Sequence, residues 1–329
     1  MKNINKSNRE LAGKTVVITG GSSGVGRAAA EAFALEGCNI VIAARGEEGI
    51  AETVKLCHDL GVMALGIKTD VSDFEQVRRL AEEAKSLNGR IDIWVNNAGV
   101  MASGKFEEIP MEVHHQTVDT NLLGYIHGAY VALPIFKAQG EGVLINNVSI
   151  GGYMPAPYSA VYSATKGGIK MMMSGLQGEI SNEPNIHICN IYPQIQRSTG
   201  NMHSAKYSGL EFKIPPFAAD PRDTAKAMVS LAKNPRKDLF PDFMSKFIKN
   251  TYQSFPSLVM NGASAVMRLG MKVKNAPDDG GNILKPSEEP HRIYGETMLP
   301  VPSKKTKKIA LAGLILAAGI CAFRRKNKD

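Results

Sequence analysis

The sequence predicts an α/β fold: a doubly wound parallel sheet flanked by helices, with a C-terminal helical extension and a hydrophobic tail. Short, apolar, β-branched runs alternate with helical stretches through residue 195, as in parallel sheets that are covered by helices on both faces. The 329 residues suit one domain of about 230 residues and an extension.

Composition divides the chain into five segments. A polar leader (1–10) precedes the sheet domain (11–235), which is followed by a helical extension (236–273), a linker (274–303) and a basic-flanked tail (304–329). Aromatic and Met side chains recur at near-helical spacing in the extension, so we expect it to pack on the domain and cover the substrate entrance. The alternative is that it also contacts a membrane surface. The linker is rich in Pro, Gly and charge and is expected to be extended.

The first strand and helix are expected on either side of a glycine-rich turn. Thr15–Thr19 reads as a buried strand and Arg27–Leu35 as an Ala-rich helix, with Gly20-Gly21-Ser22-Ser23-Gly24-Val25-Gly26 between them. Glycines let the backbone approach a phosphate closely, and free N–H groups and the helix dipole favour its negative charge. The spacing differs from the usual Gly-x-Gly-x-x-Gly, and a tight structural turn is the alternative.

The second strand, Asn39–Ala44, ends at Arg45. In a dinucleotide-binding fold this end faces the adenosine ribose, where an acidic residue binds the 2′-hydroxyl and an arginine accommodates a 2′-phosphate. No acid takes this position, so NADP(H) is favoured over NAD(H). Glu47 and Glu48 follow closely and weaken this preference, and a solvated loop arginine is the alternative.

Two further segments carry polar residues that suit a site. Ile91–Gly99 reads as a buried strand followed by a small polar turn, which either passes a flat cofactor ring or simply ends the strand. Tyr162 and Lys166 lie four residues apart, on one face of a helix. A lysine one turn away stabilises a phenolate and lowers its pKa from about 10, so the pair suits proton transfer to or from a carbonyl oxygen near neutrality.

Taken together, these segments resemble the classical short-chain dehydrogenase/reductase family, from about Leu11 to Leu231. The resemblance implies a Rossmann-like fold. The matching motifs are Thr19–Gly26, Asp70-Val71, Asn96-Asn97-Ala98-Gly99, Asn121, Ser149, Tyr162 and Lys166.

The resemblance also implies roles for four catalytic residues. Tyr162 is expected to be the general acid in reduction and the general base in oxidation, and Ser149 to stabilise charge on the substrate oxygen. Lys166 is expected to lower the pKa of Tyr162 and to bind the nicotinamide ribose, and Asn121 to position a relay water. The family usually has Pro-Gly where this chain has Pro193-Gln194, which puts the conformation of the lid in question.

Binding residues follow from the same resemblance. The expected cofactor-binding residues are Thr19, Gly20, Ser22, Ser23, Gly24, Val25, Gly26, Arg45, Asp70, Val71, Asn97, Ala98, Gly99, Tyr162, Lys166 and Ser198. The expected substrate-binding residues are Met101, Ser149, Ile150, Met154, Tyr158 and Ile195. Because most of the latter are apolar and Met adapts to varied shapes, a lipophilic ketone or secondary alcohol is favoured.

The sequence therefore predicts an NAD(P)-dependent oxidoreductase that interconverts a carbonyl and a secondary alcohol. One alternative is a soluble reductase of a polar or carrier-bound carbonyl. Another is a non-catalytic, cofactor-sensing membrane scaffold, since a fold does not by itself imply a function. The family resemblance further suggests a homo-oligomer with the long helices around 107–138 and 160–181 at the interface.

The net charge of +8 belongs mostly to the tail, since residues 304–329 carry eight Lys or Arg and one Asp. The rest of the chain has no charge excess that would attract nucleic acid. These charges flank Ile309–Phe323, fifteen residues without a charged side chain. As a helix this segment would span about 22 Å, against a hydrocarbon core of about 30 Å, and snorkelling of Lys308 and Arg324 or local thinning of the bilayer would close the gap.

We therefore expect a C-terminal membrane anchor with the catalytic domain in the cytoplasm. A buried helix, an oligomerisation segment or a soluble cytoplasmic protein are the alternatives. No signal peptide is evident at the N-terminus.

The cysteines (Cys38, Cys57, Cys189 and Cys321) and the seven histidines lack metal-ligand spacing. We expect no metal, cysteines in the core and a solvated pair at His114-His115.

Overall fold

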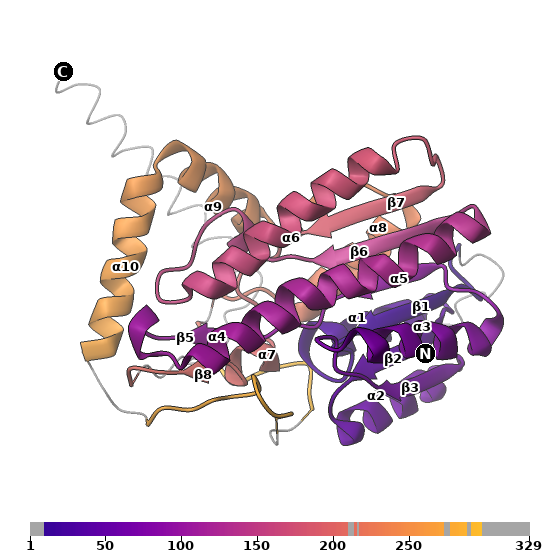
Figure 1. Cartoon of the computed structure of the whole chain (residues 1–329), viewed down its shortest axis with the longest axis horizontal. Coiled ribbons are helices and arrows are strands. Elements are labelled where there is room, and N and C mark those ends of the chain that lie inside the picture. Colours follow the sequence, from indigo (N-terminus) through magenta and orange to yellow (C-terminus); the bar gives the residue numbers. More distant parts are fainter. Residues whose placement is uncertain (1–9, 210–213, 216, 273–276, 288–290, 298–329) are drawn as a thin grey trace.

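The fold is built on one seven-stranded parallel sheet (Figure 1). The computed structural model describes residues 10–209, 214–215, 217–272, 277–287 and 291–297. The strands are β1 (Thr15–Thr19), β2 (Asn39–Ala44), β3 (Ala64–Lys68), β4 (Ile93–Asn96), β6 (Gly142–Asn147), β7 (Ile186–Ile191) and β9 (Asp238–Leu239). Their order is β3-β2-β1-β4-β6-β7-β9, and each neighbouring pair is parallel. The predicted doubly wound sheet is confirmed, with its switch point between β1 and β4.

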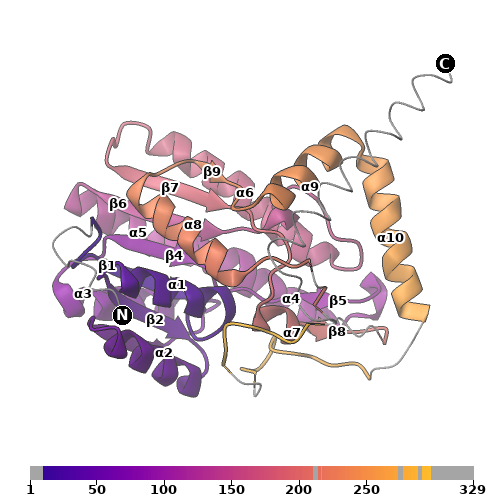
Figure 2. The ribbon, with the colours of Figure 1, turned by 180° about the vertical axis from the view of Figure 1, so that it is seen from behind.

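Helices cover both faces of the sheet (Figures 1 and 2). One face carries α1 (Gly24–Leu35), α2 (Glu47–Asp59) and α8 (Pro221–Lys233), and the other carries α3 (Phe74–Asn88), α5 (Gly124–Gln139) and α6 (Ala160–Glu179). Each face has its own apolar core, around Phe33 and Met228 on the first and around Trp94, Tyr125 and Phe136 on the second. The strands read as continuous apolar runs because both of their faces are buried.

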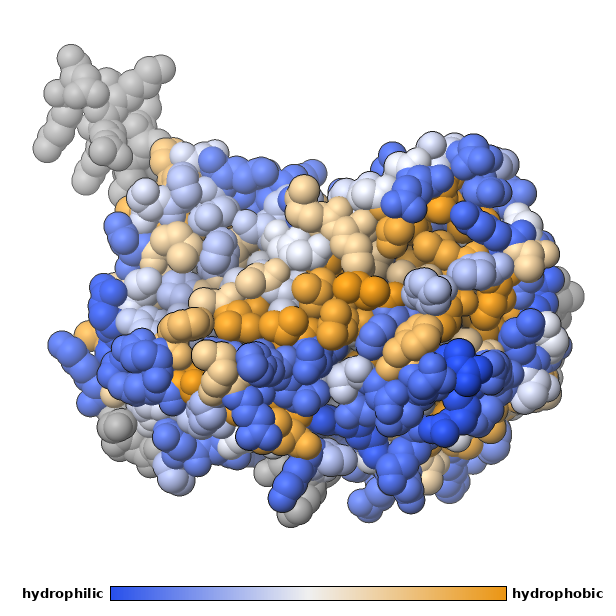
Figure 3. All heavy atoms as spheres, viewed as in Figure 1, coloured by the Kyte–Doolittle hydropathy of each residue, from blue (hydrophilic) through white to orange (hydrophobic). Residues whose placement is uncertain are grey.

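Short elements gather at the carboxyl end of the sheet. They are β5 (Ala102–Ser103), β8 (Ala205–Lys206), η2 (Phe106–Glu108), α4 (Met111–Val118), η3 (Asp119–Leu123), η4 (Ile150–Gly152) and α7 (Thr199–Met202). The η3 segment is a π-helical turn between α4 and α5, an irregularity that often marks a functional site. Hydrophobic atoms form a band across the face of α5 and α6 (Figure 3). Tyr130 of α5 and Met171 of α6 are both exposed.

The extension forms two helices, α9 (Phe243–Ser254) and α10 (Pro256–Lys272), in agreement with the helical spacing of its sequence. No helix within the described ranges is long and apolar enough to cross a membrane. The hydrophobic tail expected at 304–329, with its anchor at 309–323, lies outside the described residues.

The segment expected to be an extended linker packs against the sheet domain instead. We call its described residues from Asp279 onward, 279–287 and 291–297, the C-terminal strap (Figure 1). Single β-bridges join it to the domain at Lys206–Asp279 and Ser198–Tyr294, and the Ile283 side chain is fully buried. The composition of this segment misled the prediction because a few apolar and aromatic anchors, and not its overall polarity, decide where it lies.

The cysteine prediction holds for the three cysteines that the structure describes. Cys38, Cys57 and Cys189 are buried and free, while Cys321 lies outside the described residues. Within those ranges no group of three or more potential metal ligands occurs. The prediction for His114 was wrong: its ring is buried and stacks on Phe106, while its Nε2 pairs with the Phe106 carbonyl at 3.1 Å.

Candidate active site

A cavity of about 880 Å³ opens at the carboxyl ends of the strands, within the size range of small-molecule sites. Most of the residues expected to bind cofactor or substrate line it, and these are Gly20, Ser22, Ser23, Gly24, Val25, Gly26, Arg45, Asp70, Val71, Asn97, Ala98, Gly99, Met101, Ser149, Ile150, Met154, Tyr162, Lys166, Ile195 and Ser198. Thr19, Asn121 and Tyr158 do not line this cavity.

The glycine-rich turn joins β1 to α1 along one wall of the cavity. A Cβ on Gly20 would lie 2.9 Å from the Ala98 Cα, and one on Gly26 would lie 2.0 Å from the Gly20 oxygen, so both positions require glycine. Ser23 precedes α1 without a side-chain capping bond, and the first turn carries no acidic residue. The Gly24 N–H at the start of α1 donates to the Arg292 carbonyl at 3.0 Å, and the helix dipole favours an anion at this end.

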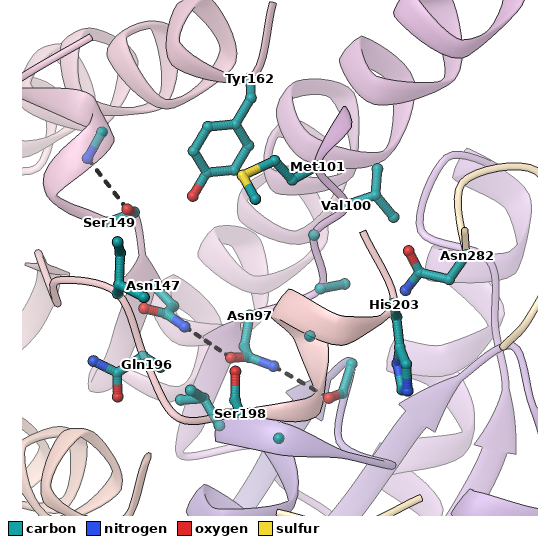
Figure 4. Close-up of a pocket in the computed structure, with 18 of the residues that line it drawn as sticks. Asn97, Val100, Met101, Asn147, Ser149, Tyr162, Gln196, Ser198, His203 and Asn282 are labelled. Carbon is teal, nitrogen blue, oxygen red and sulfur yellow. Dashed lines mark hydrogen bonds between the residues drawn. The ribbon is translucent and has the colours of Figure 1, made fainter. Parts of the chain in front are cut away.

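Thr19 supports the next turn and does not face the cavity, which corrects its expected role. Its Oγ1 accepts hydrogen bonds from the backbone N–H groups of Asn97 (3.0 Å) and Ala98 (3.2 Å). The Asn97 amide in turn donates to the carbonyls of Thr19 and Gly20, and its Oδ1 accepts from Asn147 (Figure 4). Thr19 thus holds the polar turn after β4 against the glycine-rich turn.

Ser149 and Tyr162 face the cavity from neighbouring elements (Figure 4). Ser149 follows β6 with a φ of +92°, a strained conformation for a residue with a Cβ, and its Oγ accepts from the Gly151 N–H at 3.2 Å. Tyr162 lies in the first turn of α6. A Cβ on Gly151 would come within 3.1 Å of the Tyr162 ring, so the absence of a side chain there lets the ring approach the β6–η4 turn.

Lys166 lies one turn further along α6 and is 4% exposed. Its Nζ donates to the Asn147 carbonyl at 3.4 Å and lies 5.7 Å from the centre of the Tyr162 ring. Burial lowers the pKa of Lys166 to about 7 because the cavity wall disfavours the charged form.

The lowering of the Tyr162 pKa expected from Lys166 is not found in this structure. Burial raises the pKa of the Tyr162 phenol above its ordinary value, and its hydrogen bond with Ser149 offsets only part of that rise. Lys166 is itself only partly protonated at neutrality, so its effect on the phenol is reduced. Ser149 is the group that lowers the pKa of Tyr162 and so eases its ionisation.

Asn121 binds the backbone beside the candidate catalytic residues. Its Oδ1 accepts from the Val100 N–H at 2.8 Å, while its Nδ2 donates to the Val100 carbonyl at 2.9 Å and to Thr165 Oγ1 at 3.3 Å. The π-helical turn thus places an amide that ties the segment after β4 to α6. A role for Asn121 in holding a relay water stays a prediction.

Arg45 and Asp70 lie at the opposite end of the cavity. Burial lowers the pKa of Arg45, and the nearby Asp70 carboxylate raises it. Asp70 Oδ1 accepts from the Ser72 N–H at 3.0 Å and hydroxyl at 2.7 Å. Glu47 pairs with Lys68 at 2.8 Å on the surface, so that carboxylate has a partner of its own.

The third region of the cavity is apolar. Sequence reasoning missed the contribution of Phe217. The helix α10 belongs to the extension expected to cover the substrate entrance, and its Ala263, Val266, Met267 and Gly270 face the cavity. Tyr158 was wrongly expected here. It takes a φ of +65° in the turn before α6, and its carbonyl accepts from the Gly104 N–H. At Gln194, the residue that replaces the usual glycine, the backbone N–H donates to Ser245 of α9 at 3.1 Å.

Sequence reasoning also missed a contribution from the C-terminal strap. Asn282, Pro286, Ser287 and His291 line the cavity beside Arg45 and Gly46. No motif marks these residues, and their segment has the composition of a linker.

Comparisons with known proteins agree with this geometry. The family model described as short chain dehydrogenase matches residues 14–207. The 3β-hydroxysteroid dehydrogenase 1 of Eggerthella lenta is 38% identical over 175 residues, which are 53% of this chain and 67% of the relative. Ketoacyl reductase HetN of a Nostoc species is 30% identical over 224 residues, 68% of this chain and 77% of the relative.

A solved structure shares the fold. The alcohol dehydrogenase of Thermococcus sibiricus, complexed with 5-hydroxy-NADP, has a TM-score of 0.60 and 25% identity, covering 69% of this chain and 95% of that one. The family model spans more than half of the chain and includes the glycine-rich turn, Ser149, Tyr162 and Lys166. The chain therefore belongs to the short-chain dehydrogenase/reductase family, whose members are oxidoreductases that use a nicotinamide cofactor.

Proposed function

We propose that this chain reduces a lipophilic ketone, or oxidises the corresponding secondary alcohol, with NADP(H) as the preferred cofactor. The observation that carries the proposal is that Ser149, Tyr162 and Lys166 face one cavity that continues to the glycine-rich turn and Arg45. A hydroxyl, a phenol and an ammonium group at one end, with an anion-binding turn at the other, suit carbonyl chemistry with a phosphate-bearing cofactor.

The residues of the cavity fit a nicotinamide dinucleotide. Gly20 and Gly26 leave no space for a side chain against the turn, so the backbone of the turn would approach a pyrophosphate closely. Among the described residues, the buried Asn147 Oδ1 atom has no hydrogen-bond partner, and the Lys166 Nζ donates to one carbonyl at 3.4 Å. These two groups are available to hydroxyl or amide groups of the nicotinamide half.

The side chains divide the reaction between them. When bound, the cofactor supplies or accepts the hydride. Tyr162 gives its phenolic proton to the substrate oxygen in reduction and takes it back in oxidation. The Ser149 hydroxyl donates a hydrogen bond to that oxygen as negative charge develops on it. Lys166, through its partial positive charge, stabilises the tyrosinate that remains.

The apolar region supports the substrate class. Met101, Ile150 and Met154 face the same space as side chains of α10, so a ligand there is recognised mainly through its shape and apolar surface. The relative named as a 3β-hydroxysteroid dehydrogenase agrees with a large apolar substrate. The relative named as a ketoacyl reductase supports the second candidate, a carrier-bound carbonyl.

Two further parts of the proposal concern assembly and location. We propose a homo-oligomer that buries the hydrophobic band over α5 and α6 (Figure 3). We also propose, from the sequence alone, that 309–323 anchors the chain in a membrane with the catalytic domain in the cytoplasm.

The test is cofactor oxidation by the purified full-length chain, with NADPH or NADH and matched panels of lipophilic ketones, polar ketones and ketoacyl thioesters. The proposal predicts turnover of lipophilic ketones with a kcat/KM at least about tenfold higher with NADPH than with NADH. Preference for the thioesters would favour the second candidate. Cofactor binding without turnover of any carbonyl would contradict the proposed reaction.

A further inference from the structure

The C-terminal strap follows the adenosine end of the cavity closely. At its start, Asp279 exchanges two backbone hydrogen bonds with Lys206, at 2.7 and 2.8 Å. Ile283 is then buried beside Val100, Ala102 and Tyr207. At its end, the Tyr294 ring lies between the guanidinium groups of Arg197 and Arg222, 5.3 and 5.2 Å from their carbon atoms. The strap is therefore held to the domain on both sides of the cavity.

Two groups expected to bind the cofactor also hold the strap. The Arg45 guanidinium donates to the carbonyls of Asn282, Ile283 and Lys285, while Arg45 itself lines the cavity. The backbone N–H of Gly24, in the glycine-rich turn, donates to the Arg292 carbonyl at 3.0 Å. Any ligand that bridges Arg45 and this turn is thus in direct reach of the strap.

The strap forms a wall of the cavity and does not fill it. The space of about 880 Å³ remains with the strap in place, and Asn282, Pro286 and His291 face it. The backbone N–H of Asn282 donates to the His203 carbonyl at 2.8 Å, and its side chain extends toward the cavity (Figure 4). Its Oδ1 atom is buried and has no hydrogen-bond partner within the part of the chain that the structure describes, so a bound ligand with a donor group would satisfy it.

We propose that the C-terminal strap forms the outer wall of the dinucleotide site and closes over the adenosine half of the cofactor, with Asn282 accepting a hydrogen bond from an amino or hydroxyl group of that half. This inference rests on the proposed function. It follows that the cofactor leaves only when the strap opens. Strap and cofactor then stabilise each other, because coupling between two bound elements is reciprocal.

The first test uses the wild-type full-length chain. Backbone hydrogen exchange is followed in residues 279–287 and 291–297 with and without saturating NADPH. The inference predicts exchange slowed at least about tenfold by the cofactor throughout the strap. Unchanged exchange in the strap, in a chain shown to bind NADPH, would overturn this inference and leave the proposed function standing. Failure to bind either NADPH or NADH would overturn both.

The second test compares cofactor release in two pairs of variants that leave the lining residues intact. Ile283→Ser removes a buried anchor of the strap, and its neighbour Leu284, which is 45% exposed, gives the control Leu284→Ser. Gly49→Ala places a methyl group 2.5 Å from the ring of His291, whereas Gly175→Ala adds one to open space on α6. Both glycines are helical, so alanine favours the helix in each case.

The inference predicts that NADPH dissociates at least about tenfold faster from Ile283→Ser and Gly49→Ala than from wild type, and within about twofold of wild type from the two controls. Dissociation is measured by displacement of the fluorescent reduced cofactor in stopped flow. Wild-type dissociation rates in Ile283→Ser and Gly49→Ala would overturn the inference.

Discussion

Lys166 is the ionisable side chain whose burial has the clearest measurable consequence. Its pKa falls from 10.5 to about 7 in the folded chain, so between these values the unfolded chain binds one more proton than the folded chain does. The free energy of unfolding therefore rises with pH in this window, by at most about 1.4 kcal/mol for each pH unit.

We predict that Lys166→Met removes this rise. Urea unfolding of wild type and variant between pH 6 and 8.5 gives the free energy of unfolding as a function of pH. The two plots should run parallel near pH 6, where Lys166 holds its proton in both the folded and the unfolded chain. They should diverge above pH 7 as the wild type gains stability. Curves that stay parallel to pH 8.5 would show that Lys166 keeps its proton in the folded chain.

Arg45→Ala separates the proposed binding of a 2′-phosphate from the hydrogen bonds that Arg45 makes to the strap. If its guanidinium binds a 2′-phosphate, Arg45→Ala should weaken NADPH binding at least about tenfold more than NADH binding, because only NADPH carries that phosphate. Its hydrogen bonds to the strap affect both cofactors alike. Equal losses of affinity for NADPH and NADH, measured by fluorescence titration of each cofactor, would contradict the proposed NADP preference.

Residue types and spacing predicted most of the site, and tertiary context explains the exceptions. The glycines, Ser149, Tyr162 and Lys166 line one cavity because each follows or begins an element at the same edge of the sheet. Thr19 matched the motif but bonds to the neighbouring turn, and no local pattern distinguishes that contact from one to a ligand. Nor does spacing reveal that α6 would bury Lys166 enough to lower its pKa.

Among the elements, α9 is joined to the segment after β7 by one buried hydroxyl. Ser245 Oγ accepts from the Gln194 N–H and donates to Asp242 at 2.7 Å, and the residue is fully buried. Ser245→Ala should lower the free energy of unfolding by about 1–3 kcal/mol, because the Gln194 N–H is left without its acceptor.

Thermal unfolding checks this prediction, with Ser174→Ala on α6 as the control because the exposed Ser174 hydroxyl donates to the Lys170 carbonyl of its own helix. We also expect a higher KM for the carbonyl in Ser245→Ala, since Gln194 and Ile195 line the cavity. A melting temperature equal to that of Ser174→Ala would show that Gln194 finds another partner.

Elements that are buried on both faces were the most predictable. The strands Thr15–Thr19 and Asn39–Ala44 have the bounds expected from the sequence. The strap was not predictable in this way because its position depends on single anchors such as Ile283 and Tyr294 within a polar segment, and on Arg45 far away in the sequence. Hydrophobic periodicity carries no information about such contacts.

For the whole molecule, the hydrophobic band over α5 and α6 is the surface expected in an oligomer (Figure 3). Met171 on α6 is 69% exposed, and a lysine there would place a charge inside the expected interface, where unpaired charge is costly. We predict that Met171→Lys shifts the chain to a smaller species.

Light scattering after size-exclusion chromatography of the detergent-solubilised chain measures the mass of the assembly. Met63→Lys, at a position 48% exposed between α2 and β3, is the control and should keep the wild-type mass. An unchanged mass for Met171→Lys would place the interface elsewhere.

The chain as a whole brings the Tyr162 phenol, the Ser149 hydroxyl and the glycine-rich turn to one cavity. The measurement that tests this account most directly is turnover by Tyr162→Phe beside wild type and Tyr130→Phe, an exposed control on α5. The account predicts that Tyr162→Phe loses at least about 100-fold in kcat while its NADPH dissociation constant stays within about threefold. Turnover near the wild-type rate would contradict the assignment of Tyr162 as the proton donor.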